Sequence, residues 1–297
     1  MNHIKDQIRC GAAYRLGLTG KGIGVAVLDT GIFLHRDFDS RVTGFADMVN
    51  GKTFAYDDCG HGTHICGIIG GSGRMSGGRY SGIAPGCDLV MVKVLDRKGN
   101  GYSSDVLAGI SWILERKEKL GIRILNISVG ACSKRGMSEN SALVKGVNRA
   151  WDAGLMVVVA AGNNGPRTMS ITTPGISRKV ITVGCSDDDR EVLVGGNRMV
   201  DYSGRGPTAA CICKPDLVAP GCSVVSCSSR ADKYTIKSGT SMSTPIVSGA
   251  VALLLERFPD MTNKDVKLRL RESSVDIGLP RNQQGWGLLD VGKMIGK

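Results

Sequence analysis

The sequence predicts an α/β fold built on a mostly parallel sheet. Short apolar runs alternate with stretches of helical periodicity along the 297 residues, which is the order that βαβ units produce. Glycine is abundant, at 42 residues, while aromatic residues make up only 5% of the chain; this composition suits tight turns and close contacts between helices and a sheet. Because 42% of the residues are hydrophobic and 22% charged, we expect one globular domain spanning residues 1–297.

The short apolar runs predict six strands, and several of them lack alternating polar residues, as expected for parallel strands covered on both faces. These strands are residues 23–28, 88–94, 122–127, 156–160, 180–183 and 214–218. Helices are predicted at residues 103–119, 141–153, 241–257 and 262–272. Ligand sites of open parallel sheets lie at the carboxyl ends of the strands. Polar residues directly after strands are therefore the first candidates for a functional site.

The composition also argues against two kinds of partner. The formal net charge is +11, but the Lys and Arg residues are scattered, with no basic run and no interleaved aromatic residues, so we expect no nucleic-acid partner. The longest apolar runs are too short to cross a bilayer, and the start MNHIKDQIRC lacks the apolar core of a signal peptide. We expect no membrane association and a cytoplasmic protein if Met1 is the natural start; a trimmed fragment of a secreted protein would look the same.

The ten cysteines are irregularly spaced, which is not typical of a disulfide scaffold, and we expect free thiols. The pair in Cys211-Ile212-Cys213 lacks the two-residue gap that is common in zinc sites. Structural zinc is therefore not expected from the spacing.

Four polar clusters are candidates for chemistry. Asp29-Thr30-Gly31 follows the first strand, and Asn163 lies just after the strand at 156–160; either could be a simple turn residue. His61 and His64 could be metal ligands, but no HExxH motif and no third ligand are evident. Ser241 begins a predicted helix and could be only an N-cap. The same position suits a nucleophile, because unpaired N–H groups and the helix dipole favour a developing oxyanion.

Taken together, these clusters resemble the motifs of the subtilisin-like serine proteases. The matching segments are VLDTG, GHGTHICG, AAGNNGP and SGTSMSTP, in the family's order of Asp, His and Ser, and further matches such as SGIAPG, YSGRGPT and KPDLVAPG extend the similarity from about Gly20 to Val291. The resemblance implies a subtilisin-like three-layer α/β/α fold with a mostly parallel central sheet of about seven strands. It also implies a serine endopeptidase, with residues 1–16 as an N-terminal extension.

The resemblance also implies roles for individual residues. Ser241 would be the nucleophile, His61 the general base and then acid, and Asp29 the carboxylate that orients the imidazole. Asn163, together with the Ser241 N–H group, would form the oxyanion hole. His64 is predicted to be structural.

By the same resemblance, peptides or unfolded proteins would bind as an extended strand with broad specificity. The pocket for the residue before the scissile bond would be lined in part by residues 170–172. Thr172 stands where some relatives have glycine, so we expect a shallower pocket that prefers medium-sized apolar side chains. The full set of predicted substrate-binding residues is Lys98, Gly99, Asn100, Gly101, Ser128, Val129, Gly130, Ala160, Ala161, Gly162, Thr172 and Thr240.

The sequence departs from the secreted members of the family in two respects. The motif Asp29 leaves little room before it for a signal peptide and pro-domain, so the chain resembles the bacterial intracellular branch or a trimmed catalytic domain, and the segment from Met1 to Arg15 is a candidate restraint on the active site. Asp37 matches one calcium ligand of many relatives, but the loop at residues 70–82 has Arg74 and Arg79 and no carboxylate.

We therefore expect no cofactor for catalysis and no metal ligand at that loop. The run Asp187-Asp188-Asp189 is left as an alternative calcium candidate, with a solvated turn as the favoured interpretation.

Two other functions stay open at this point. A catalytically silent subtilisin fold used as a binding or regulatory module is disfavoured because all four catalytic positions hold competent residues. A hydrolase of non-peptide substrates is disfavoured because residues 98–101 and 128–130, which would lie on either side of the substrate, suit the backbone of an extended peptide. The oligomeric state is not predicted.

Overall fold

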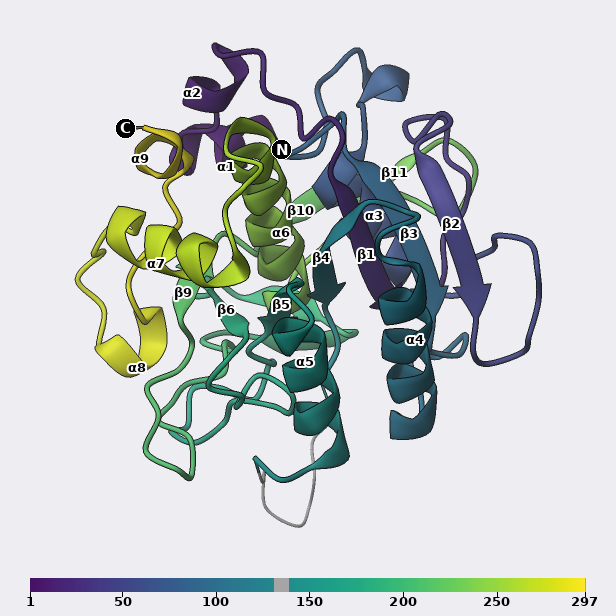
Figure 1. Cartoon of the computed structure of the whole chain (residues 1–297). Helices are drawn as coiled ribbons and strands as arrows, with labels where there is room; N and C mark the ends of the chain where they lie inside the picture. Colours follow the sequence, from purple (N-terminus) through teal and green to yellow (C-terminus); the bar gives the residue numbers. More distant parts are fainter. Residues whose placement is uncertain (131–138, 297) are drawn as a thin grey trace.

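The computed structural model describes residues 1–130 and 139–296. Its centre is a seven-stranded sheet in the order β2-β3-β1-β4-β5-β6-β9, and every pairing in it is parallel (Figure 1). In that order, the strands are Val42–Asp47, Asp88–Lys93, Gly24–Asp29, Ile122–Ile127, Met156–Ala160, Ile181–Cys185 and Leu217–Ala219. The prediction of a mostly parallel sheet of about seven strands is confirmed.

Helices cover both faces of this sheet. On one face, α3 and α6 contact each other and the central strands; on the other, α4 and α5 contact each other and strands β1 and β5 (Figure 1). The result is the expected three-layer α/β/α arrangement. The longer helices are α3 (His61–Gly70), α4 (Ser103–Arg116), α5 (Ala142–Asp152), α6 (Thr240–Arg257) and α7 (Asn263–Ser273), and the shorter ones are α1 (Asn2–Gln7), α2 (Gly11–Tyr14), η1 (Arg74–Ser76), α8 (Arg281–Gln284) and α9 (Val291–Ile295).

Two antiparallel hairpins lie outside the central sheet. One pairs β7 (Val192–Val194) with β8 (Asn197–Met199), and the other pairs β10 (Val224–Cys227) with β11 (Tyr234–Lys237). Neither hairpin is predicted from the sequence. Edge strand β2 is not predicted either, because it is only half-buried and contains Gly44, so it has no continuous apolar run. The predicted strand at 214–218 begins later, at Leu217, since Pro215 has no N–H group for a ladder hydrogen bond.

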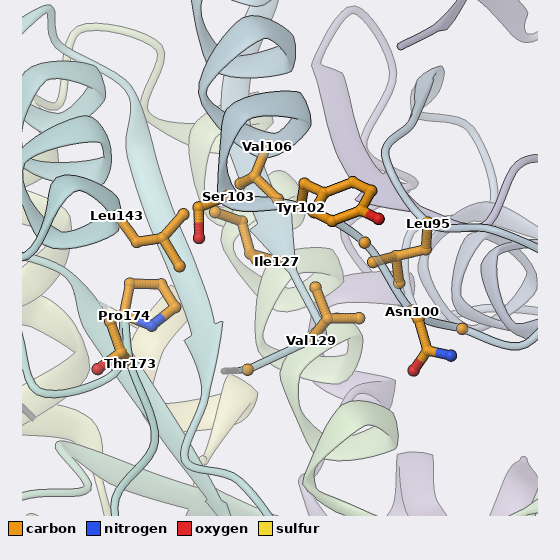
Figure 2. Close-up of a pocket in the computed structure, with 13 residues that line it drawn as sticks. Leu95, Asn100, Tyr102, Ser103, Val106, Ile127, Val129, Leu143, Thr173 and Pro174 are labelled. Atoms are coloured by element: carbon orange, nitrogen blue, oxygen red, sulfur yellow. The ribbon is translucent and has the colours of Figure 1, made fainter. Parts of the chain in front are cut away.

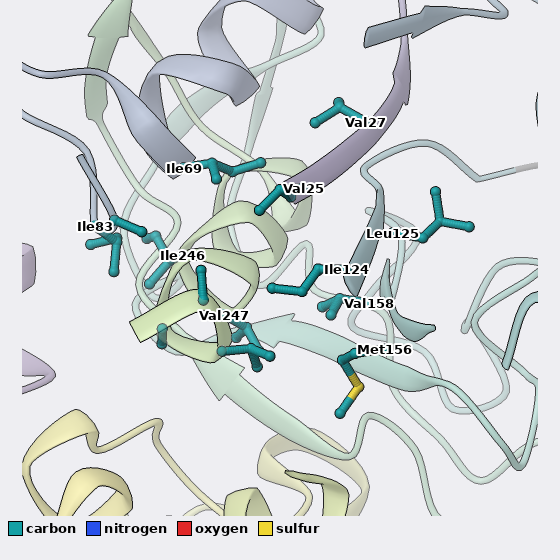
Figure 3. Packing of buried hydrophobic residues seen from close by; sticks show 14 of the residues in the cluster. Val25, Val27, Ile69, Ile83, Ile124, Leu125, Met156, Val158, Ile246 and Val247 are labelled. Carbon is teal, nitrogen blue, oxygen red and sulfur yellow. The ribbon is translucent and has the colours of Figure 1, made fainter. Parts of the chain in front are cut away.

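The hydrophobic core lies on both faces of the sheet, and its larger helices are α3 and α6 on one face and α4 and α5 on the other. Figure 3 shows Ile246 and Val247 of α6 facing Val25 and Ile124 of the sheet, with Ile69 of α3 beside them. Helix α6 is buried along almost its whole length, as expected for a helix in the interior of a layered fold. This packing fixes the start of α6, where Ser241 lies, against the carboxyl ends of the strands.

The segment at residues 1–15 is part of this packed structure. Ile4 and Ile8 are fully buried, the Tyr14 hydroxyl donates to the Ile83 carbonyl, and the Val291 N–H of α9 donates to the Ile8 carbonyl. Helices α1, α2 and α9 lie at the end of the molecule where β1 begins (Figure 1). Since Asp29 is at the other end of β1, the hypothesis that this segment restrains the active site is not supported by its position.

In the described part of the chain, nine cysteines are present and each is free; Cys132 lies outside the described residues. No helix within residues 1–130 and 139–296 is both long and apolar enough to cross a membrane.

Candidate active site

Asp29 and His61 meet at the carboxyl end of β1. Asp29 is the last residue of that strand and is fully buried. The Nδ1 atom of His61 lies 2.8 Å from Oδ1 and 2.9 Å from Oδ2 of Asp29. Because the carboxylate can only accept, Nδ1 must carry the proton. This tautomer leaves Nε2 free of its proton, which is the form that a general base requires.

The position of His61 is set by the start of helix α3. The first N–H groups of a helix lack intrahelical partners, and here the Asp57 carboxylate accepts from the N–H groups of Gly60 and Thr63, while the Thr30 hydroxyl accepts from that of Gly62. Gly62 has no side chain to keep it from the Gly31 carbonyl, which a Cβ atom would overlap. The helix can therefore approach the loop after β1 closely enough for its first residue to reach Asp29.

The two histidines of the third cluster differ in their environments. Burial lowers the pKa of His61, but the charge and hydrogen bond of Asp29 outweigh this and raise it above the ordinary value. His64 is fully buried, and its Nε2 lies 3.1 Å from the Val224 carbonyl and 3.2 Å from that of Thr235. Burial and the charges of Lys237 and His61 lower the pKa of His64 to about 3. A neutral His64 that ties α3 to the β10–β11 hairpin fits the predicted structural role.

Ser241 and Asn163 lie side by side at the start of α6. The Oδ1 atom of Asn163 accepts two hydrogen bonds from Thr240, one from its N–H group and one from its hydroxyl, both of 3.0 Å. These bonds fix the amide so that its Nδ2 group remains as a donor. The hydroxyl of Ser241 donates to the Ser128 carbonyl over 2.6 Å. Thr240 itself is fully buried, so it acts on the site chiefly by orienting Asn163.

A surface cavity of about 450 Å³ joins these residues. His61, Ser241 and Asn163 line it together, and Asp29 lies behind His61. Of the predicted substrate-binding residues, those that line this cavity are Lys98, Gly99, Ser128, Val129, Gly130, Ala160, Gly162, Thr172 and Thr240.

Three of the twelve predicted substrate-binding residues lie elsewhere. Ala161 is fully buried and does not line the cavity; its carbonyl accepts from the N–H group of Thr172, so its contribution is through the backbone. Asn100 and Gly101 line a neighbouring pocket instead. Ser170 is also turned away, since its hydroxyl donates to the Arg167 carbonyl.

The neighbouring pocket has a volume of about 220 Å³ and is largely apolar. Figure 2 shows Val106, Ile127, Val129 and Leu143 around it, with Tyr102 at one side. It shares Leu95, Gly99, Val129 and Gly130 with the main cavity. One extended chain lying between these shared residues would therefore pass both pockets.

Two residues that influence His61 are not predicted from the sequence. Lys237, the last residue of β11, lines the cavity, and its positive charge lowers the pKa of His61. Asp57 anchors the start of α3, as described above. Both residues reach His61 only in the folded structure. The sequence gives one weak indication for Asp57, because acidic residues are common near the start of a helix.

The two calcium candidates do not fit a calcium ion. The carboxylate of Asp37 already accepts from the Met75 N–H group and from the Tyr234 hydroxyl, and Asp187 accepts from the N–H groups of Gly221 and Cys222. A hard cation needs several oxygen ligands, whereas the candidate ligands beside Asp37 are His35 and Cys227 and those beside Asp187 are Cys185 and Cys222.

Comparisons with known proteins agree with this geometry. The profile of the subtilase family matches residues 20–287. The serine protease AprX of Bacillus subtilis strain 168 is 42% identical over 92% of this chain, and the chain spans 65% of that protein. Subtilisin Savinase of Lederbergia lenta is 34% identical, with 96% of this chain and 95% of that protein covered.

Solved structures agree as well. Sphericase superposes with a TM-score of 0.79 at 32% identity, covering 92% of this chain and 93% of its own. A cold adapted subtilisin-like serine proteinase superposes with a TM-score of 0.75 at 29% identity, covering 92% and 90% respectively. The chain therefore belongs to the subtilase family of subtilisin-like serine proteases.

Proposed function

We propose that this chain is an endopeptidase that cleaves peptide bonds through an acyl-enzyme intermediate, with Ser241, His61 and Asp29 as its catalytic residues. The observation that carries the proposal is the pairing of the His61 Nδ1 atom with both oxygens of the buried Asp29, at 2.8 and 2.9 Å, beside a cavity that Ser241 and Asn163 also line. A buried carboxylate behind a half-exposed imidazole, with a hydroxyl in the same cavity, is the arrangement that nucleophilic acyl transfer requires.

Each residue then has one task. The Ser241 oxygen attacks the scissile carbonyl carbon while Nε2 of His61 takes its proton, and the carbonyl oxygen becomes an oxyanion held by the Asn163 Nδ2 group and the Ser241 N–H group. His61 next donates that proton to the leaving amine, which leaves the acyl group on Ser241. Water then attacks the ester with the same base, and the carboxylic acid departs. Throughout, Asp29 stabilises the imidazolium.

The hydrogen bond from Ser241 to the Ser128 carbonyl suggests how substrate activates the nucleophile. Ser128 is one of the predicted substrate-binding residues, and a bound peptide would donate a hydrogen bond from one of its N–H groups to the same carbonyl. When the peptide takes this acceptor, the hydroxyl loses its partner at 2.6 Å. Rotation about the Cα–Cβ bond of Ser241 then presents the proton to His61.

Asn163→Ala tests the oxyanion hole. We expect kcat to fall about 10²–10³-fold, which is the loss known for the corresponding asparagine of subtilisin, a member of the same family. KM should change little, because the lost hydrogen bond forms in the transition state. The comparison is steady-state cleavage of a peptide anilide by wild type and variant. A loss expressed in KM alone would show that Asn163 binds the ground state rather than the oxyanion.

Thr172 sets the depth of the pocket that precedes the scissile bond. Its side chain lies against Gly130 and Gly162, so closely that a Cβ atom on either glycine would overlap it. This crowding supports a shallow pocket and a preference for medium-sized apolar residues. Apolar side chains farther along the peptide would enter the pocket of Val106, Ile127 and Leu143.

Thr172→Gly tests this account of specificity. Removing the side chain should deepen the pocket and raise the ratio of kcat/KM for Phe over Val at the position before the scissile bond by about tenfold or more. A matched Thr172→Ser variant, which loses only the methyl group, should give an intermediate ratio. Profiling of a peptide library measures all three proteins. Unchanged ratios would mean that Thr172 does not limit the pocket.

Lys237 should shift the pH dependence of the reaction. His61 must be neutral to act as a base, so activity falls on the acid side as pH drops through the pKa of His61. The charge of Lys237 lowers that pKa, and its loss in Lys237→Met raises it. The acid limb of kcat/KM against pH should therefore move to higher pH. Added salt should move the wild-type limb in the same direction, because it screens the charge.

Lys233→Met, on the same hairpin but exposed, is the matched control and should leave the limb in place. If Lys237→Met and Lys233→Met give the same profile, the Lys237 charge does not act on the base.

The overall proposal is tested by incubating the purified chain with a denatured protein and identifying the fragments by mass spectrometry. We expect internal cleavages with broad sequence preference and an apolar bias before the cleaved bond. Release of terminal residues only would contradict the assignment as an endopeptidase. No fragments under conditions where the chain is folded would favour a catalytically silent module.

A further inference from the structure

Two buried cysteines far apart in the sequence meet beneath the start of α6. Cys185 is the last residue of β6 and is fully buried, and Cys222 follows β9, the neighbouring strand, at 8% exposure (Figure 1). Tyr202, also fully buried, places its hydroxyl oxygen 3.1 Å from each sulfur. The two thiols therefore share one small polar space inside an apolar surrounding.

A carboxylate completes this group. Oδ1 of Asp187 lies 3.1 Å from the Cys185 sulfur, and the Cys222 thiol donates to the backbone carbonyl of Asp187 over 2.6 Å. The two sulfur atoms and a carboxylate oxygen all lie within 4.8 Å of one another. Asp187 is only partly buried, so the group can be reached from solvent on its side.

These spacings suit a tetrahedral metal ion. Zinc binds thiolate sulfur at about 2.3 Å and carboxylate oxygen at about 2.0–2.2 Å, so two ligands on one ion lie about 3.5–3.8 Å apart. The three ligand atoms lie no more than 4.8 Å apart, so the widest pair needs to close by only about an ångström to reach that geometry. Sulfur ligands favour thiophilic ions such as Zn²⁺ or Cd²⁺ over Ca²⁺ or Mg²⁺.

We propose that Cys185, Cys222 and Asp187 form a binding site for one thiophilic divalent cation. Binding replaces two S–H protons by two metal–sulfur bonds, with the protons released to solvent, and no electron transfer takes place. Cys211 and Cys213 lack the spacing of a zinc site, whereas Cys185 and Cys222 are far apart in the sequence and are brought together by the pairing of β6 with β9.

Hydrogen bonds of the backbone connect the proposed metal site to the segment just before Ser241. Asp187 Oδ1 accepts from the N–H groups of Gly221 and Cys222, and the Gly221 carbonyl accepts from Gly239, two residues before Ser241, over 3.0 Å. A Cβ atom on Gly221 would lie 2.9 Å from the Cys185 sulfur, so this glycine is packed between the site and α6. Drawing Cys222 onto a metal ion therefore shifts the segment that positions Ser241, and bound metal should lower peptidase activity.

The experiment is a titration with Cd²⁺, followed by the ultraviolet charge-transfer absorption of cadmium thiolate. It is done in a Cys211→Ser/Cys213→Ser background, because those two exposed cysteines could bind metal themselves. We expect one Cd²⁺ per chain with two thiolates per ion, displaced by Zn²⁺ and unaffected by Ca²⁺. Cys222→Ser and Cys185→Ser, each tested alone, should weaken Cd²⁺ binding by more than about 100-fold. Each removes a direct ligand, and the loss of a residue that only hydrogen-bonds to a ligand already costs about 10–100-fold in metal affinity.

Asp187→Asn separates binding from folding. The amide oxygen can still accept from Gly221 and Cys222, so the loop is retained while the charged ligand is lost, and affinity should fall with little change in the melting temperature of the metal-free protein. Asp189→Asn, an exposed neighbour, should bind Cd²⁺ like the parent. Undiminished binding in Cys222→Ser, the absence of the charge-transfer band in the parent, or isolation of the chain with a Cys185–Cys222 disulfide would overturn the proposal.

The activity measurement rests on the proposed peptidase function and is separate from the binding measurement. Peptide cleavage should fall with the same midpoint as the absorption rises, and Asp187→Asn should be less sensitive to Cd²⁺. Binding without any change in cleavage would refute the coupling to Ser241 but keep the site. A chain that cleaves no peptide but binds Cd²⁺ as described would refute the proposed function alone.

Discussion

Ser241→Ala is expected to lower kcat by about 10⁶-fold, the order of loss known for the nucleophile of subtilisin. The variant keeps the buried part of α6 and the bonds from Thr240 to Asn163, so its fold and substrate affinity should be retained. In the proposed mechanism the lost hydroxyl oxygen forms the acyl ester, so the residual rate should reflect the oxyanion hole and substrate binding alone. Steady-state cleavage of a peptide anilide, with fold checked by circular dichroism, measures the loss.

Ser243→Ala is the matched control for this variant. Ser243 lies on the same helix, is fully buried, and its hydroxyl oxygen has no hydrogen-bond partner within the described residues, so its removal should leave kcat almost unchanged. Comparable rates in Ser241→Ala and wild type would mean that another residue is the nucleophile.

Asp29→Asn is expected to lower kcat by about 10⁴-fold, the order seen when the aspartate of such a triad becomes asparagine. An amide can donate a hydrogen bond to Nδ1 of His61, which favours the tautomer with its proton on Nε2. That nitrogen must be unprotonated to accept the proton of Ser241. The loss of the carboxylate charge also removes the main influence that raises the pKa of His61. The acid limb of the remaining activity should therefore move to lower pH.

The control is Asp39→Asn, an exposed carboxylate at a positive φ of 48°, a conformation that asparagine also tolerates. It should leave both kcat and the pH profile unchanged. An Asp29→Asn variant with near wild-type kcat would show that the buried carboxylate does not orient the base.

The strands and site residues that depend on a short segment of sequence could be predicted from the sequence alone. Strands β4 and β5 match their predicted bounds because both are short, largely apolar segments that are buried almost throughout. The clusters around Asp29, His61, Asn163 and Ser241 could be found because each follows a strand or begins a helix. The structure places these four side chains at one edge of the sheet, as the common direction of parallel strands requires.

The unpredicted features arise where distant segments meet. Lys237 lies near His61 only because the β10–β11 hairpin folds over α3, and nothing in the sequence around Lys237 indicates a role at the site. The side chain of Ala161 is fully buried although that of Ala160, the last residue of β5, lines the cavity, because successive side chains of a strand point to opposite sides. Cys185 and Cys222 meet through the pairing of β6 with β9, which no spacing rule for nearby ligands detects.

The role of Ser241 as the nucleophile is tested most directly by locating the residue that reacts with an active-site phosphonate reagent. The folded wild-type chain is treated with a peptidyl phosphonate and digested, and the adduct is mapped by mass spectrometry. We expect a single adduct on Ser241, which is absent in Ser241→Ala and forms much more slowly in Asp29→Asn. An adduct on a different residue, or equal labelling of Ser241→Ala, would contradict it.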